Sequence, residues 1–107
     1  MKNKEVEHIF NQIGEESLFT IWGAAAKGIT FLNYLKKDIH WRIPFVIDIN
    51  EAKQGKYCAG TGHKIMPPSI LRRREDIKDI IIMNPNYLHE ISTCLSINNR
   101  KFNLFTI

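Results

Sequence analysis

The most constraining feature of this chain is a regular alternation between short apolar runs and segments with helical periodicity. Residues 18–22, 45–47 and 79–83 are short, rich in β-branched or aromatic side chains, and nearly free of polar residues. Such runs are typical of strands that are buried on both faces of a sheet. The strands of an antiparallel sheet with one solvent-exposed face would instead alternate apolar and polar residues.

The helical segments lie before, between and after these runs. Val6, Ile9, Phe10 and Ile13 form the apolar stripe of a helix over about residues 3–13. Further predicted elements are a helix after residues 23–28, a short helix from Ser69, a helix started by Asn84-Pro85, and a strand over residues 102–107. Alternating elements with buried strands predict an α/β fold, a single small Rossmann-like three-layer domain over residues 1–107 with a mostly parallel sheet of about four strands.

Composition limits the partners and the compartment. The chain has 107 residues, and 15 Lys and Arg against 11 Asp and Glu leave a net charge of +4. This charge suits an anionic small molecule and is too weak to indicate nucleic acid. No apolar run approaches the roughly 20 residues that cross a bilayer, and the first residues lack a signal peptide. We therefore expect a cytoplasmic protein without a membrane contact, with Cys58 and Cys94 as reduced thiols.

A loop of small residues over residues 23–28 carries the strongest binding signal. Gly23, Ala25 and Gly28 fit G-x-A-x-x-G, a relative of the dinucleotide fingerprint, and Asp48 follows about 20 residues beyond Gly28 at the end of a strand. Free N–H groups at the helix start, together with Lys27, would attract an anion. Small residues are also needed simply to pack such a corner, and an exposed helix lysine needs no ligand, so both interpretations stay open.

Other residues are candidates for the same ligand, each with a plainer alternative. Asn50 would contact hydroxyl groups; Tyr57 would stack on a base or sugar, or pack over the core edge; and His63 would bind a ligand, or remain a solvated loop histidine. Asn84 would present its amide at the sheet edge, or only cap a helix. The four histidines lack metal-ligand spacing, so no metal is expected.

A recognisable sequence pattern extends beyond the loop over residues 23–28, which we call the glycine loop. Four ordered blocks carry it: residues 22–28 with 32–34; residues 46–50 with 53–57; residues 59–61 with Ile65 and Pro68; and Asn84 with Glu90-Ile91. Together they resemble the C-terminal domain of S-adenosylmethionine-dependent sugar C-methyltransferases, which act on nucleotide-linked deoxysugars. The chain departs from that pattern at Ala59, at residues 62–64 and at Met83, and these changes cluster in the loop nearest a substrate.

The resemblance implies that methyl transfer and sugar-nucleotide binding belong to different domains. In that family the methyl donor and the catalytic base belong to a separate, preceding domain, so this chain would bind no cofactor itself and would form one wall of a nucleotide-sugar cleft. Its candidate binding residues are Gly23, Ala25, Lys27, Gly28, Asp48, Asn50, Tyr57, His63 and Asn84. No self-contained catalytic constellation is present in the sequence.

Two alternatives belong to other functional classes. The glycine loop with Asp48 would also suit a free-standing nucleotide- or dinucleotide-binding module. The third hypothesis is a purely structural or interaction domain that has lost its ligand, in which the apolar stripe of residues 3–13 is exposed and contacts a partner or a second copy of the chain.

Overall fold

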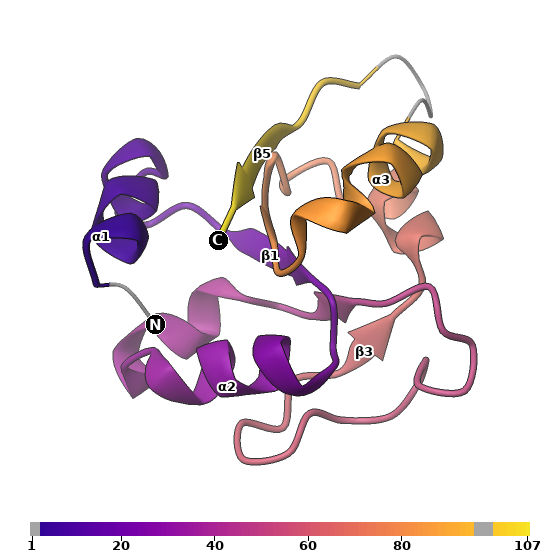
Figure 1. Cartoon of the computed structure of the whole chain (residues 1–107), viewed down its shortest axis with the longest axis horizontal. Helices are drawn as coiled ribbons and strands as arrows, with labels where there is room; N and C mark the ends of the chain where they lie inside the picture. Colours follow the sequence, from indigo (N-terminus) through magenta and orange to yellow (C-terminus); the bar gives the residue numbers. More distant parts are fainter. Residues whose placement is uncertain (1–2, 96–99) are drawn as a thin grey trace.

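Five parallel strands form one sheet in the order β3-β2-β1-β4-β5 (Figure 1). The structure is a computed structural model that describes residues 3–95 and 100–107. The strands are β1 (Phe19–Trp22), β2 (Val46–Ile47), β3 (Ile65–Met66), β4 (Asp79–Ile82) and β5 (Asn103–Thr106). The chain starts at the centre of the sheet, winds to one edge, and then crosses to the other side of β1. The carboxyl ends of β1 and β4 therefore flank the point where the strand order reverses, which is where open α/β sheets bind ligands.

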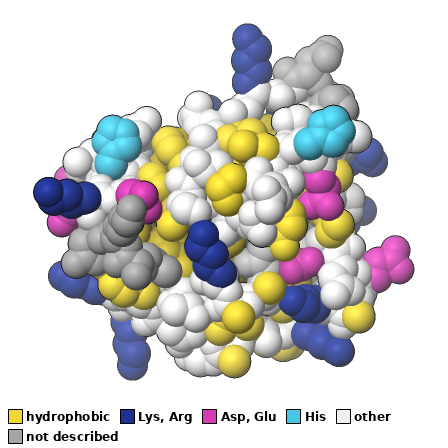
Figure 2. All heavy atoms as spheres, in the orientation of Figure 1, with side chains coloured by type: hydrophobic (Ala, Val, Ile, Leu, Met, Phe, Trp, Pro, Cys, Tyr) yellow, Lys and Arg dark blue, Asp and Glu magenta, His cyan; other side chains and the backbone are white. Residues whose placement is uncertain are grey.

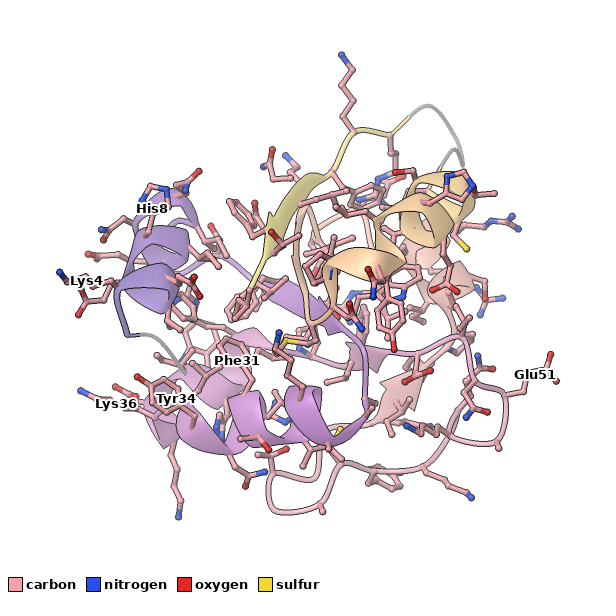
Figure 3. The ribbon with its side chains drawn as sticks, viewed as in Figure 1. Lys4, His8, Phe31, Tyr34, Lys36 and Glu51 are labelled. Carbon is pink, nitrogen blue, oxygen red and sulfur yellow. The ribbon has the colours of Figure 1, made fainter. Side chains whose placement is uncertain are left out.

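Helices cover both faces of the sheet, as the sequence predicts. On one face lie α1 (Asn3–Gln12), α2 (Ala26–Tyr34) and η1 (Lys37–Arg42); on the other lie η2 (Pro68–Arg73), η3 (Pro85–Tyr87) and α3 (Leu88–Cys94). Neighbouring strand residues belong to opposite cores, because side chains alternate along a strand. Ile81 packs with Phe31 of α2, which points toward the sheet in Figure 3, whereas Ile80 and Ile82 pack with Ile91 of α3.

The sheet has one strand more than the sequence analysis predicted. Ile65 and Met66 form β3, in register with Val46 and Ile47 of β2. A run of two residues has no periodicity that could distinguish it from a loop, so only its tertiary pairing identifies it. The segment after it, which was expected to be a short helix from Ser69, is the 3-10 helix η2.

The first helix is part of the core and not an exposed contact face. Val6, Ile9 and Ile13 are at most 7% exposed and pack with Phe19 and Phe31. The expectation that this stripe is free to bind a partner is therefore wrong. The stripe has the periodicity of a surface helix, and that periodicity alone does not say whether the helix covers this sheet or another protein.

Candidate functional site

The loop after β1 turns sharply at Gly23. Its backbone has φ = +118°, in the region that favours glycine, and its N–H donates to the Ile47 carbonyl at 2.7 Å. A Cβ at this position would lie 3.3 Å from Met83 Cβ and 3.5 Å from a ring carbon of Tyr87. The predicted role of Gly23 in a tight turn is confirmed.

Gly28 allows α2 to pack directly against that turn. A Cβ on Gly28 would lie 1.9 Å from the Gly23 carbonyl oxygen, far inside any real contact distance. This agrees with the close helix–strand packing that the third position of the fingerprint predicts. Backbone sterics therefore require glycine at position 28 of α2, whatever the loop binds.

The amino terminus of α2 is open toward this edge of the sheet. Ala25 is the N-cap residue and its side chain supplies no capping hydrogen bond. The first N–H groups of a helix have no partner within the helix and carry the positive end of its dipole. Such a terminus has the chemistry to accept an anion.

The Asp48 carboxylate is hydrogen-bonded to the glycine loop (residues 23–28). One of its carboxylate oxygens accepts the Ala24 N–H and the other accepts the Asn50 N–H, each at 2.9 Å. The Ala24 N–H is therefore already used and is not free for a ligand. Each carboxylate oxygen has two lone pairs, so Asp48 can still accept a further donor.

The segment after Asp48 brings a lysine to the same loop. The Asn50 side chain accepts the Ala52 N–H at 3.0 Å, and Gln54 donates to the Asp48 carbonyl at 2.9 Å. This folded turn lets Lys53 reach the Ala24 carbonyl oxygen at 3.4 Å. The sequence analysis did not propose Lys53 as a site residue; the signal was its place in the turn over residues 53–57, which resembles the family.

Two cavities flank the glycine turn. The β1–β2 cavity has a volume of about 220 Å³ and is lined by Trp22, Gly23, Ala25, Asp48, Ile49, Asn50, Lys53, Tyr87 and Glu90. The β1–β4 cavity has a volume of about 100 Å³ and is lined by Gly23, Ala25, Lys27, Gly28, Met83, Asn84 and Tyr87. Seven of the nine candidate residues line one or both, and Tyr87 lies between the two cavities.

Lys27 and Asn84 also make contacts of their own. The Lys27 ammonium donates to the Ile107 carbonyl at 2.8 Å, which links α2 to the end of β5. The Asn84 side chain accepts the Asn86 N–H at 3.0 Å, so the capping role holds while Asn84 also lines the β1–β4 cavity. Both residues have structural partners at the site's edge.

Tyr57 and His63 lie in another part of the molecule and line neither cavity. Tyr57 is 65% exposed on the loop over residues 55–64. One ring nitrogen of His63 lies 2.7 Å from Thr61 Oγ1, and the other lies 3.1 Å from the His40 carbonyl oxygen. Because a carbonyl only accepts, that second nitrogen is a donor and links the loop to η1, while the nitrogen beside Thr61 makes a contact within the loop.

Two residues of this edge were not singled out as ligand-binding candidates. Tyr87 precedes α3, and the polar neighbours of Glu90 in the sequence favour a surface role over a catalytic one. Glu90 instead lines the β1–β2 cavity, and its Oε2 atom is buried without a hydrogen-bond partner among the described residues. The sequence signal for Glu90 was its place in the family-like pair Glu90-Ile91, and Tyr87 had none, because only the docking of α3 on the sheet brings both residues to this edge.

Within residues 3–95 and 100–107, no three His, Cys, Asp or Glu side chains are grouped as metal ligands would be. Among those same residues, none of the helices has the length and apolar character to span a bilayer. On the face drawn in Figure 2, Lys and Arg side chains are scattered over the middle and the outline instead of gathering over one element.

The fold and the site define the class of protein: a small Rossmann-like α/β domain with cavities at the carboxyl ends of its central strands. Residues 1–102 match the family model of the C-methyltransferase C-terminal domain, and the chain belongs to that family. The resemblance inferred from the four sequence blocks is thereby confirmed. No curated protein shows significant similarity to the chain.

Solved structures support the fold independently. The crystal structure of RSP, a Rex-family repressor, aligns with a TM-score of 0.59 and 16% identity, covering 95% of this chain and 60% of that one. RSP in complex with β-NADH gives the same score and identity, with 95% and 61% covered. The chain thus spans about three-fifths of these structures, and at this identity the likeness shows the Rossmann-like fold.

Proposed function

We propose that this domain binds the phosphate-bearing part of a nucleotide-linked sugar and forms one wall of a methyltransferase cleft. The observation that carries the proposal is the pair of cavities beside an uncapped helix start, with Lys27 on one side and Lys53 on the other. The helix dipole and the two ammonium groups favour negative charge at the turn. Asp48 and Asn50 would then contact hydroxyl groups in the β1–β2 cavity.

The size of the site suits a wall better than a complete pocket. The larger cavity has about 220 Å³, whereas pockets that enclose a small molecule have about 300–1,000 Å³. A separate S-adenosylmethionine-binding domain would cover the remaining ligand surface and would supply the methyl donor and the base. This chain would hold and orient the sugar nucleotide.

A free-standing dinucleotide-binding module is the second candidate. Its support is the fold shared with RSP, which binds β-NADH according to its crystal structure. Two features weigh against tight dinucleotide binding here: Ala25 replaces the central glycine, and Tyr87 packs close to Gly23. We therefore expect NADH to bind more weakly than a sugar nucleotide.

NMR titration of the chain with UDP-glucose, UDP and NADH tests the proposal, because it detects millimolar affinity. The amide signals of residues 24–28 should shift most with the two uridine compounds. Lys27→Ala should weaken UDP binding about fivefold, the loss of about 1 kcal/mol of charge-assisted contact. Lys36→Ala, at the opposite end of α2 and pointing outward in Figure 3, is the matched control and should change nothing. Equal weakening by both variants, or no shift with any uridine compound, would reject the proposal.

A further inference from the structure

Glu90 brings a buried side-chain oxygen, unpaired among the described residues, to the β1–β2 cavity. It lies on α3 and lines the β1–β2 cavity with Asp48 and Lys53. Its Oε2 atom is buried and has no partner within the described part of the chain. By contrast, both Asp48 oxygens already accept backbone N–H groups.

A buried acceptor without a donor destabilises the folded protein. The cost is about 1–3 kcal/mol for a neutral group and more for a charged one. The last torsion of a glutamate side chain is broad and soft, so a small rotation can turn the carboxylate into the cavity that it lines. A ligand that offers donors there would remove this cost, whereas a packing role would be better served by an apolar side chain.

We propose that Glu90 accepts hydroxyl groups from a polyol ring of the bound ligand, either its ribose or its sugar. This rests on the proposed function, because the phosphate of the same ligand lies at the start of α2. The two cavities share Gly23, Ala25 and Tyr87, so one molecule can extend across both. Asp48 and Glu90 disfavour a second anionic group in the β1–β2 cavity, while neutral hydroxyls donate to carboxylates without repulsion.

Glu90→Gln separates this role from a structural one, because it keeps the shape and removes the charge. Glu51→Gln makes the same change of charge on an exposed side chain of the neighbouring turn, which points outward in Figure 3, and serves as the control. Affinities of both variants and of the parent chain are measured by NMR titration with UDP-glucose, UDP and 2′-deoxy-UDP. Thermal midpoints without ligand are recorded in parallel.

If ribose is the source of the hydroxyls, the parent prefers UDP over 2′-deoxy-UDP by about tenfold, and Glu90→Gln abolishes this preference. If the sugar is the source, the preference of the parent for UDP-glucose over UDP is lost instead. In either case the midpoint of Glu90→Gln is equal to or above that of the parent, because a half-buried carboxylate with an unpaired oxygen has been removed.

Two results would overturn the inference. A parent that binds nucleotides, with the same ligand preferences in Glu90→Gln, shows that Glu90 does not read hydroxyl groups and leaves the proposed function intact. A parent that binds none of the three compounds overturns the proposed function, and the role of Glu90 with it.

Discussion

Two loops of this domain contain glycine and polar residues, and they use their polar groups differently. In residues 55–64, His63 engages both ring nitrogens, and Asn33 of α2 donates to the Ala59 carbonyl at 3.1 Å. In residues 23–28, the helix start lacks a side-chain cap, and cavities lie on both sides of the turn. Glycine content therefore does not identify a ligand site by itself. Unsatisfied polar groups beside a cavity are the more discriminating sign.

The largest expected effect is on the loop over residues 23–28, at Gly28. Gly28→Ala places a Cβ 1.9 Å from the Gly23 carbonyl oxygen, and backbone must move to relieve the clash. We expect a loss of about 3 kcal/mol in the free energy of unfolding, at the upper end for overpacking. Gly62→Ala, in the other loop, meets no atom within 4 Å, and its φ of +78° should cost only about 1–2 kcal/mol.

Urea unfolding of both variants measures this difference. A Gly28→Ala protein as stable as Gly62→Ala would mean that α2 can move away from the turn without cost. The cavities beside the turn would then be deformable, and their present shape would say little about a ligand.

The second-largest expected effect concerns His63, in the loop over residues 55–64. His63→Ala removes one hydrogen bond to Thr61 within the loop and one to the His40 carbonyl of η1, and we expect a loss of about 1–2 kcal/mol in unfolding free energy. The affinity for UDP should stay within about twofold of the parent, because His63 lines neither cavity. His8→Ala on the exposed side of α1 is the control for removing an imidazole. Much weaker UDP binding by His63→Ala, without loss of stability, would restore the original ligand-binding hypothesis.

The sequence predicted the fold better than the site. The runs that contain Ile21, Val46 and Ile81 are buried on both faces in the structure, so their continuous apolar character was sufficient. β3 was missed because two residues form a strand only by pairing with β2. These elements differ in whether local composition or tertiary pairing determines them.

For the site, backbone roles were predictable and side-chain partners were not. Gly23 and Gly28 occupy the positions that a strand–turn–helix corner requires. The position of Asp48 was also correct, but its bond to Ala24 depends on how β2 lies beside β1. Glu90 comes from a helix distant in sequence, and its burial depends on how α3 docks on the sheet.

The smallest expected effect concerns Cys58, a buried thiol in the loop over residues 55–64. Burial raises the pKa of Cys58, with Lys53 opposing the shift, so the folded protein keeps this proton at a pH where the unfolded chain loses it. The unfolded state then binds fewer protons, and stability falls as pH rises above about 8.5, the ordinary thiol pKa, toward the folded value.

Cys58→Ala removes this dependence, so its unfolding free energy should fall less than that of the parent between pH 8 and pH 10. Burial and Glu90 also raise the pKa of Cys94, so Cys94→Ala provides the comparison for a thiol that is less buried. We expect the flatter pH dependence with both variants and the larger change with Cys58→Ala, because desolvation grows with burial. If unfolding free energy falls equally with pH in the parent and in Cys58→Ala, the loop over residues 55–64 opens readily to water. The difference drawn above between this loop and the loop over residues 23–28 would then not hold.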